Sequence, residues 1–182
     1  STNDIDSDGC QDFTEDWDWD NDGVDFEDDS CQGGDLNWTS SNSTDWDSDG
    51  CQDATEDDDD DNDSVLDDFD SCSTGDLGWS SNTTNDHDSD GCQDATEDDD
   101  DDNDSVLDVF DACTPGDLGW TSDNSTDWDS DGCQDATEDD DDDNDGVGDI
   151  SDLCSTGDLG WTSNSTNDID SDGCQDFSED WD

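Results

Sequence analysis

The sequence contains no lysine, arginine, methionine or tyrosine, and it has a single histidine and a single proline. Its 65 acidic side chains therefore have no lysine or arginine partner within the chain, and the formal net charge is −65. Two like charges about 4 Å apart repel by ~1 kcal/mol in water, and by more near a protein surface. Acidic runs such as 57–61 must therefore bind cations from outside the chain, or they keep the chain expanded. The same lack of cationic side chains excludes nucleic acid as a partner, because the surface repels phosphate.

Apolar side chains are scarce as well. Between positions 45 and 85 the non-cysteine apolar residues are Trp46, Ala54, Val65, Leu66, Phe69, Leu77 and Trp79. This set is too small to bury the surface that would offset the entropy of ordering the chain. Composition alone favours intrinsic disorder, but nine cysteines and nine tryptophans argue against it. No signal peptide, transit peptide or membrane span is visible in the sequence.

A repeat of 41 residues organises the chain. Two cysteine series and one tryptophan series keep this spacing: Cys10, Cys51, Cys92, Cys133 and Cys174; Cys31, Cys72, Cys113 and Cys154; and Trp38, Trp79, Trp120 and Trp161. Such self-similarity is typical of tandem-repeat architectures. We therefore interpret residues 1–182 as one continuous array. Its expected repeats are 4–44, 45–85, 86–126 and 127–167, followed by a partial repeat, 168–182.

A longer period is superimposed on the first. Residues 165–182 reproduce residues 1–18 except that Ser178 replaces Thr14. This offset equals four repeats, so we expect the chain to be a window from a longer array with a four-repeat super-period. Neither helices nor strands are expected, because apolar residues follow no sustained period and Asp, Asn, Gly, Ser and Thr favour turns. The sequence predicts an irregular backbone wrapped around metal.

The first of two aspartate motifs in each repeat reads D-x-D-x-D-G-C-Q-D-x-[TS]-E and occurs five times. It fits the calcium-loop pattern D-x-[DN]-x-[DN]-G-x₅-E. Ca²⁺ takes six to eight oxygen ligands, the sixth-position glycine permits a sharp turn, and the twelfth-position glutamate can bind bidentately. The expected ligands are Asp4, Asp6, Asp8, Asp12 and Glu15; Asp45, Asp47, Asp49, Asp53 and Glu56; Asp86, Asp88, Asp90, Asp94 and Glu97; Asp127, Asp129, Asp131, Asp135 and Glu138; and Asp168, Asp170, Asp172, Asp176 and Glu179.

The second motif follows directly and ends at a cysteine. Its expected ligands are Asp59, Asp61, Asp63, Asp67 and Asp70; Asp100, Asp102, Asp104, Asp108 and Asp111; and Asp141, Asp143, Asp145, Asp149 and Asp152. The first copy contributes Asp18, Asp20 and Asp22, but Phe26 occupies its ninth position and Asp25 lies one residue early. We expect several Ca²⁺ ions in each repeat.

An EF-hand would need amphipathic helices on both sides of each loop, and the sequence offers none. The tandem D-x-D-x-D motifs, each tied to a cysteine, resemble thrombospondin type 3 repeats over the whole chain. They are similar to versions that form long arrays in secreted and surface proteins of microbes. The resemblance implies an elongated, disulfide-stapled rod with little regular secondary structure, wound around a row of Ca²⁺ ions. Two departures are a cysteine at the seventh position of the first motif and a tryptophan loop between motifs.

The density of cysteine indicates a disulfide framework and an oxidising compartment. Adjacent cysteines allow pairing across the tryptophan loop or across the aspartate run, as in Cys51–Cys72. Free thiols and zinc are further alternatives, although no paired histidines support zinc. The resembled family joins the cysteine that ends one motif to that of the next motif. This implies Cys31–Cys51, Cys72–Cys92, Cys113–Cys133 and Cys154–Cys174, and it leaves Cys10 to pair upstream of the window.

The 41-residue tryptophan series is expected to pack against the disulfides and neighbouring leucines, giving each linker a small core. Sugar stacking or contact with a second chain is the functional alternative. His87 occupies a slot filled elsewhere by Ile5, Trp46, Trp128 and Ile169, so we expect an exposed side chain there. Sequons recur once per repeat at Asn42, Asn82, Asn124 and Asn164, and their placement predicts N-linked glycans. Asn62 and Asn103 also match, but they lie inside the metal motifs.

These features predict an extracellular or cell-surface structural protein: a calcium-binding, disulfide-stapled repeat rod that forms a stalk, spacer or filament with copies of itself. The alternative is a calcium-dependent binding or adhesion module for carbohydrate, mineral or a protein partner. Enzymatic function is not expected, because the sequence lacks a Ser/His/Asp set, lysine and a phosphate loop. Calcium explains the carboxylates better than catalysis does.

Overall fold

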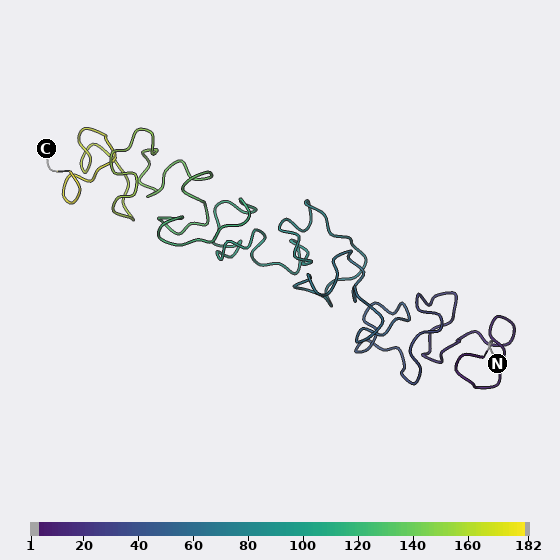
Figure 1. Ribbon diagram of the computed structural model, residues 1–182. Coiled ribbons are helices and arrows are strands. Elements are labelled where there is room, and N and C mark those ends of the chain that lie inside the picture. The colour runs from purple at the N-terminus through teal and green to yellow at the C-terminus, as the bar shows by residue number, and fades with distance from the viewer. Residues whose placement is uncertain (1–3, 181–182) are drawn as a thin grey trace. The chain divides into compact units, whose positions relative to one another are not determined.

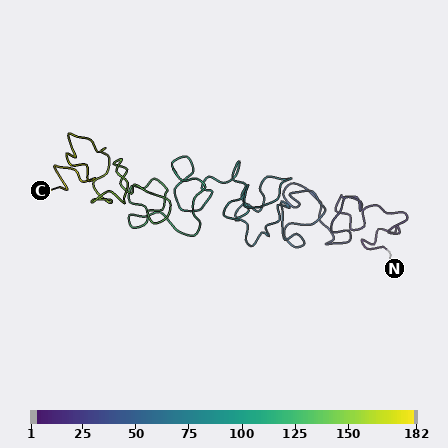
Figure 2. The same cartoon turned by 90° about the horizontal axis from the view of Figure 1, so that it is seen from above.

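The computed structural model describes residues 4–180, and this part of the chain contains no helix and no strand. An isolated β-bridge pairs Asp12 with Asp16. Loops and turns follow one another along the trace in Figure 1, and the view from above shows the same irregular course (Figure 2). Short polar side chains hydrogen-bond to nearby backbone and so compete with helix and sheet. The predicted irregular fold is confirmed.

The chain divides into two compact units, residues 1–97 and 98–182. The boundary falls inside the expected repeat 86–126, and the last two residues of the expected partial repeat 168–182 lie outside the described residues. Each unit contains disulfides: Cys31–Cys51 and Cys72–Cys92 in the first, and Cys113–Cys133 and Cys154–Cys174 in the second. These are the pairs that the resemblance implied. Cys10 is exposed and forms no disulfide within the described residues.

The backbone conformation repeats every 41 residues in both units. Positive φ angles between 62° and 65° recur at Ser7, Ser48, Ser89, Ser130 and Ser171. Positive φ angles recur two residues later as well, with values of 86–99°, at Gly9, Gly50, Gly91, Gly132 and Gly173. In the tryptophan loop they recur at Asn37, Gly78, Gly119 and Gly160, so Asn37 adopts the conformation of the glycines that it replaces. Asparagine tolerates this left-handed region better than most other non-glycine residues.

Backbone hydrogen bonds hold each tryptophan loop against the motifs on either side. In the first unit, the Ser71 N–H donates to the Asp90 carbonyl at 2.7 Å, next to the Cys72–Cys92 disulfide. The Ser81 N–H donates to the Asp63 carbonyl at 2.8 Å. In the second unit, Ala112 and Ser122 donate in the same way to Asp131 and Asp104. A disulfide and two backbone bonds thus join each loop to its neighbours.

The buried interior is made of aspartate and cystine instead of aliphatic side chains. The buried apolar residues of the described chain are Trp19, Cys51, Cys92, Cys133 and Cys174. The leucines of the linkers, Leu36, Leu77, Leu118 and Leu159, are 41–52% exposed and so do not form a buried core, whereas the loop tryptophans are half-buried. By contrast, Asp45, Asp63, Asp86, Asp104, Asp127, Asp145 and Asp168 are completely inaccessible to solvent.

The slot occupied by His87 is not uniformly exposed: Ile5 and Ile169 are exposed there, but the prediction of an exposed side chain is wrong for His87. Trp46 is half-buried, and its Nε1–H donates to the carbonyl of Gly75, 29 residues ahead, at 3.0 Å. Trp128 donates to Gly157 at the same distance and separation. His87 is also half-buried. At this slot the larger side chains reach the loop that follows the next motif.

We expect Gly132→Ala to destabilise the chain more than Gly119→Ala. Both glycines have positive φ angles, 92° and 84°, so alanine is strained at either position by roughly 1–3 kcal/mol. A Cβ at Gly132 would also meet the carboxylate of Asp111 and lie 3.0 Å from its Cα, whereas one at Gly119 meets nothing within 4 Å. Thermal unfolding in calcium, followed by tryptophan fluorescence, measures both losses. Equal losses would contradict the close approach of Asp111.

Candidate metal centres

The second motif of repeat 45–85 brings Asp59, Asp61 and Asp63 together. Each offers one carboxylate oxygen, and these oxygens lie within 4.8 Å of one another. Asp61 and Asp63 are almost completely buried, at 1% and 0% exposure. At this separation two unit charges repel by about 3 kcal/mol with an effective dielectric constant of 20. The group is therefore unfavourable with all three carboxylates charged, unless a cation lies among its oxygens.

In Asp59 and Asp63, one carboxylate oxygen accepts a backbone hydrogen bond and the other does not, whereas both oxygens of Asp61 accept one. Oδ2 of Asp59 accepts from Ser64 N at 3.2 Å, and Oδ1 of Asp63 accepts from Val65 N at 2.7 Å. The other oxygen of each, Oδ1 of Asp59 and Oδ2 of Asp63, is buried and has no hydrogen-bond partner. Buried polar atoms without a partner are costly and rare in proteins. One oxygen fixes the local backbone, and the other remains available for a ligand.

Asp70 completes this arrangement. Its Oδ1 accepts from Cys72 N at 2.6 Å, while its Oδ2 is buried and has no hydrogen-bond partner. The same division of oxygens recurs in both units. The corresponding buried oxygens without partners belong to Asp18, Asp22 and Asp29; Asp100 and Asp104; and Asp141, Asp145 and Asp152.

Asp29 is a candidate ligand that the sequence analysis missed. It is 4% exposed, and its Oδ1 accepts from Cys31 N at 2.7 Å, as Asp70 accepts from Cys72 N. In this copy Phe26 occupies the ninth position, and the sequence analysis considered the neighbouring Asp25 instead of Asp29. The spacing Asp-x-Cys, shared by Asp29, Asp70, Asp111 and Asp152, is the signal that identifies it.

The first motif also gathers its three alternate aspartates. The groups Asp4, Asp6 and Asp8; Asp45, Asp47 and Asp49; and Asp86, Asp88 and Asp90 each offer oxygens within 4.8 Å of one another. In the second of these, Asp45 accepts from Asp49 N at 3.0 Å and from Gly50 N at 3.3 Å. The side-chain amide of Asn62, from the second motif, donates to Asp47.

The expected ninth and twelfth ligands of the first motif have further contacts outside it. Oδ1 of Asp53 accepts from Trp46 N at 3.0 Å. Oε1 of Glu56 accepts from Asp35 N at 2.6 Å, 21 residues earlier in the preceding tryptophan loop, and its Oε2 is buried without a hydrogen-bond partner. Glu97 and Glu138 bond in the same way to Asp76 and Asp117.

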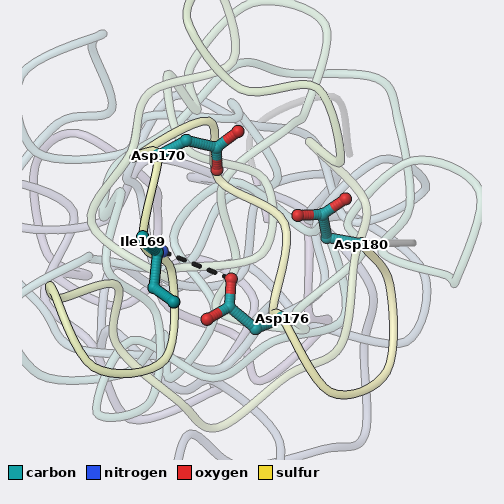
Figure 3. A pocket seen from close by; sticks show the side chains of 4 residues that line it. All are labelled: Ile169, Asp170, Asp176 and Asp180. Atoms are coloured by element: carbon teal, nitrogen blue, oxygen red, sulfur yellow. Dashed lines mark hydrogen bonds between the residues drawn. The ribbon is translucent and has the colours of Figure 1, made fainter. Parts of the chain in front are cut away.

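The last copy of the first motif is shown in Figure 3. Ile169 N donates to Oδ1 of Asp176 at 3.2 Å, and the carboxylates of Asp170 and Asp180 lie around the same hollow. Asp180 immediately follows the twelfth position of the motif and was not among the expected ligands. Its equivalents are Asp16, Asp57, Asp98 and Asp139.

Electrostatics in these clusters favour protonation in the absence of a metal. Burial, as the largest cause, and neighbouring carboxylates, including Asp61, together raise the pKa of Asp63 to about 6 and that of Asp70 to about 7. Burial likewise raises the pKa values of Asp22 and Asp29 to about 6. These shifts have the direction expected for desolvated acids beside like charges.

The donor set fits a hard divalent cation. The donors are carboxylate oxygens, which favour Ca²⁺, Mg²⁺ and Mn²⁺ over softer metals. Several are buried without a hydrogen-bond partner, and the chain has no lysine or arginine to neutralise them. Aspartate clusters that can hold metal ions therefore recur through both units. The chain matches no protein-family model and no curated protein. Among the described residues, no helix is long and apolar enough to cross a membrane.

Without divalent ions, the chain should be more ordered at pH 4.5 than at pH 8. Folded-state pKa values of about 6 to 7, above the ordinary 3.8, mean that the folded chain binds more protons than the unfolded chain between about pH 4 and pH 7. Stability therefore falls as pH rises through this window. Small-angle scattering and tryptophan fluorescence of metal-depleted protein test this. Equal or greater order at pH 8 would contradict the clustering of these carboxylates.

Proposed function

We propose that this chain is an extracellular structural protein, a calcium-binding repeat array in which bound ions take the place of a hydrophobic core. One observation carries the proposal: buried carboxylate oxygens without partners recur in both units, beside other carboxylates and without lysine or arginine. Calcium suits this setting better than magnesium. Ca²⁺ accepts six to eight oxygens in flexible geometry, whereas Mg²⁺ keeps several waters and is usually bound by only one or two carboxylates.

The disulfides support the proposed location. Four disulfides indicate an oxidising environment, which is typical of secreted and cell-surface proteins. Extracellular calcium modules bind with dissociation constants of roughly 10⁻⁴ to 10⁻³ M, so even weak sites are useful outside the cell. We therefore place the protein outside the cell or on its surface.

The distribution of contacts supports the proposed structural role. Within the first unit, disulfide Cys72–Cys92 and the bond from Trp46 to Gly75 join neighbouring stretches of chain, 20 and 29 residues apart. Contacts of this local kind are characteristic of repeat arrays, which extend by adding units. A stalk, spacer or filament of thrombospondin type 3-like repeats is the form that we propose. On this reading the carboxylates are metal ligands and have no enzymatic role.

Removal of calcium should abolish order along the chain, because the ligand carboxylates repel one another once the ions leave. Small-angle scattering should show expansion in chelator, and tryptophan fluorescence should change, both reversing when Ca²⁺ is added. Sodium chloride at matched ionic strength is the control, since it screens charge without occupying sites. Unchanged profiles in excess chelator, or full recovery with sodium chloride alone, would refute the proposal.

Glycans are expected at Asn42, Asn82, Asn124 and Asn164, all of which are exposed. Asn62 is a matched internal control: it has the sequon, but its amide donates to Asp47 within the metal motifs. Peptide mapping of native protein before and after glycosidase treatment should show sugar at the four sites and none at Asn62. Bare asparagine at all four would make them ordinary loop residues.

Exposed apolar side chains favour a second candidate function, a calcium-dependent binding or adhesion module. Phe69 and Phe110, one repeat apart, are 76% and 75% exposed, and Ile150 is fully exposed. Such side chains on a highly charged surface can contact a partner. Electron microscopy of native material separates the two candidates, because uniform filaments support the structural role and discrete bound partners support recognition.

A further inference from the structure

Where both motifs of a repeat have an aspartate at the ninth position, the two aspartates are held in the same way. In repeat 45–85, Asp53 accepts from Trp46 N and Asp67 accepts from Asp60 N, each through Oδ1 at 3.0 Å. The Asp53 N–H donates to the carbonyl of Thr44 at 3.1 Å, and the Asp67 N–H donates to that of Asp58 at 3.0 Å. The two carboxylates therefore have equivalent local supports, one from each motif.

These aspartates belong to one cluster together with Asp57 and Asp60. Burial, as the largest cause, and the charges of Asp67, Asp53 and Asp57 together raise the pKa of Asp60 to about 7, so each of these three carboxylates lies near enough to Asp60 to act on its charge. Oδ1 of Asp60 and Oδ2 of Asp57 are buried without hydrogen-bond partners. Asp60 lies between the alternate ligands Asp59 and Asp61, so it is not among the expected ligands of its own loop.

The second unit contains the same cluster in Asp135, Asp139, Asp142 and Asp149. Asp142 is 9% exposed, and its Oδ1 has no hydrogen-bond partner. Oδ2 of Asp139 is also buried without one. Asp142 N donates to Oδ1 of Asp149 at 3.1 Å, as Asp60 N does to Asp67. A charged carboxylate oxygen buried beside other carboxylates is unfavourable unless a cation lies next to it.

The repeat 4–44 has aromatic residues at the corresponding positions. Trp19 stands where the later repeat has Asp60, and Phe26 stands where it has Asp67. Their rings stack with centroids 5.4 Å apart and planes 6° apart, and Trp19 is 7% exposed. Phe13 packs against Trp19 with ring centroids 4.1 Å apart. A pair of carboxylates in one repeat is thus replaced by a stacked apolar pair in another.

We propose that Asp53, Asp57, Asp60 and Asp67 bind an additional Ca²⁺ between the two motifs, that Asp135, Asp139, Asp142 and Asp149 do the same, and that aromatic packing replaces this ion in repeat 4–44. The inference rests on the proposed function, since it assumes that the array binds calcium. It adds a calcium site at the junction between the first and second motifs of a repeat, distinct from the sites within each motif. It also assigns a metal-free junction to repeat 4–44, where Trp19 and Phe26 stack.

The test counts bound ions on the full chain by native mass spectrometry and calorimetric titration with Ca²⁺. Asp60→Asn combined with Asp142→Asn should bind one ion fewer per altered junction, because neither residue is an expected loop ligand. Asp68→Asn combined with Asp140→Asn removes the same charge at exposed positions and should bind as many ions as the unchanged chain. An equal count in both variants would overturn the inference.

A gain of binding provides the complementary test. Trp19→Asp combined with Phe26→Asp should add one ion, because it rebuilds the four carboxylates with Asp12 and Asp16. Loss of the calcium-dependent fluorescence change would reveal that this variant fails to fold. The reverse exchange, Asp60→Trp with Asp67→Phe, then provides the test. Loss of one bound ion with retained order supports the inference, and an unchanged ion count overturns it. Failure of the unchanged chain to bind any Ca²⁺ would instead refute the proposed function.

Discussion

Repulsion among carboxylates is the constraint on which the rest of this structure depends. The chain has 65 acidic side chains and no lysine or arginine, yet it places aspartates such as Asp45, Asp63 and Asp145 where solvent cannot reach them. Backbone N–H groups satisfy one oxygen of many of these aspartates, which orients the other oxygen without neutralising it. If the clusters bind cations as we propose, these ions complete the fold, and its stability is linked to their concentration.

Much of this organisation could be predicted from sequence, because its causes are local. The irregular backbone follows from the aspartate, asparagine and glycine content, and the clustering of Asp59, Asp61 and Asp63 follows from their alternate spacing. The fixed period allowed pairing across the tryptophan loop or across the aspartate run, and the resemblance to thrombospondin type 3 repeats implied the pairs that are observed. Asp29 was not predicted because positions in this copy of the second motif were counted forward from its first aspartate, Asp18. Counting back from Cys31, which ends the motif, identifies Asp29 as the equivalent of Asp70.

The remaining features depend on how distant segments pack, which no local pattern encodes. Trp46 reaches Gly75, and Glu56 reaches Asp35, across 29 and 21 residues. The leucine near each loop tryptophan was predicted to form part of a small apolar core. It is instead about half exposed, because cystine and aspartate fill the interior. Expectations drawn from hydrophobic cores therefore fail where metal ligands and disulfides set the packing.

The position of the disulfides also determines how such a chain would respond to pulling. Cys72 and Cys92 are 20 residues apart in sequence, but their Cα atoms are only 5.1 Å apart. Tension applied at the two ends passes through the sulfur atoms and bypasses the tryptophan loop between them. The loop and any sugar attached at Asn82 are thereby protected from stretching, while the aspartate run from Cys51 to Cys72 carries the force. Extension of the chain would then be governed by release of ions from that run, so the surrounding calcium concentration would set its mechanical stiffness.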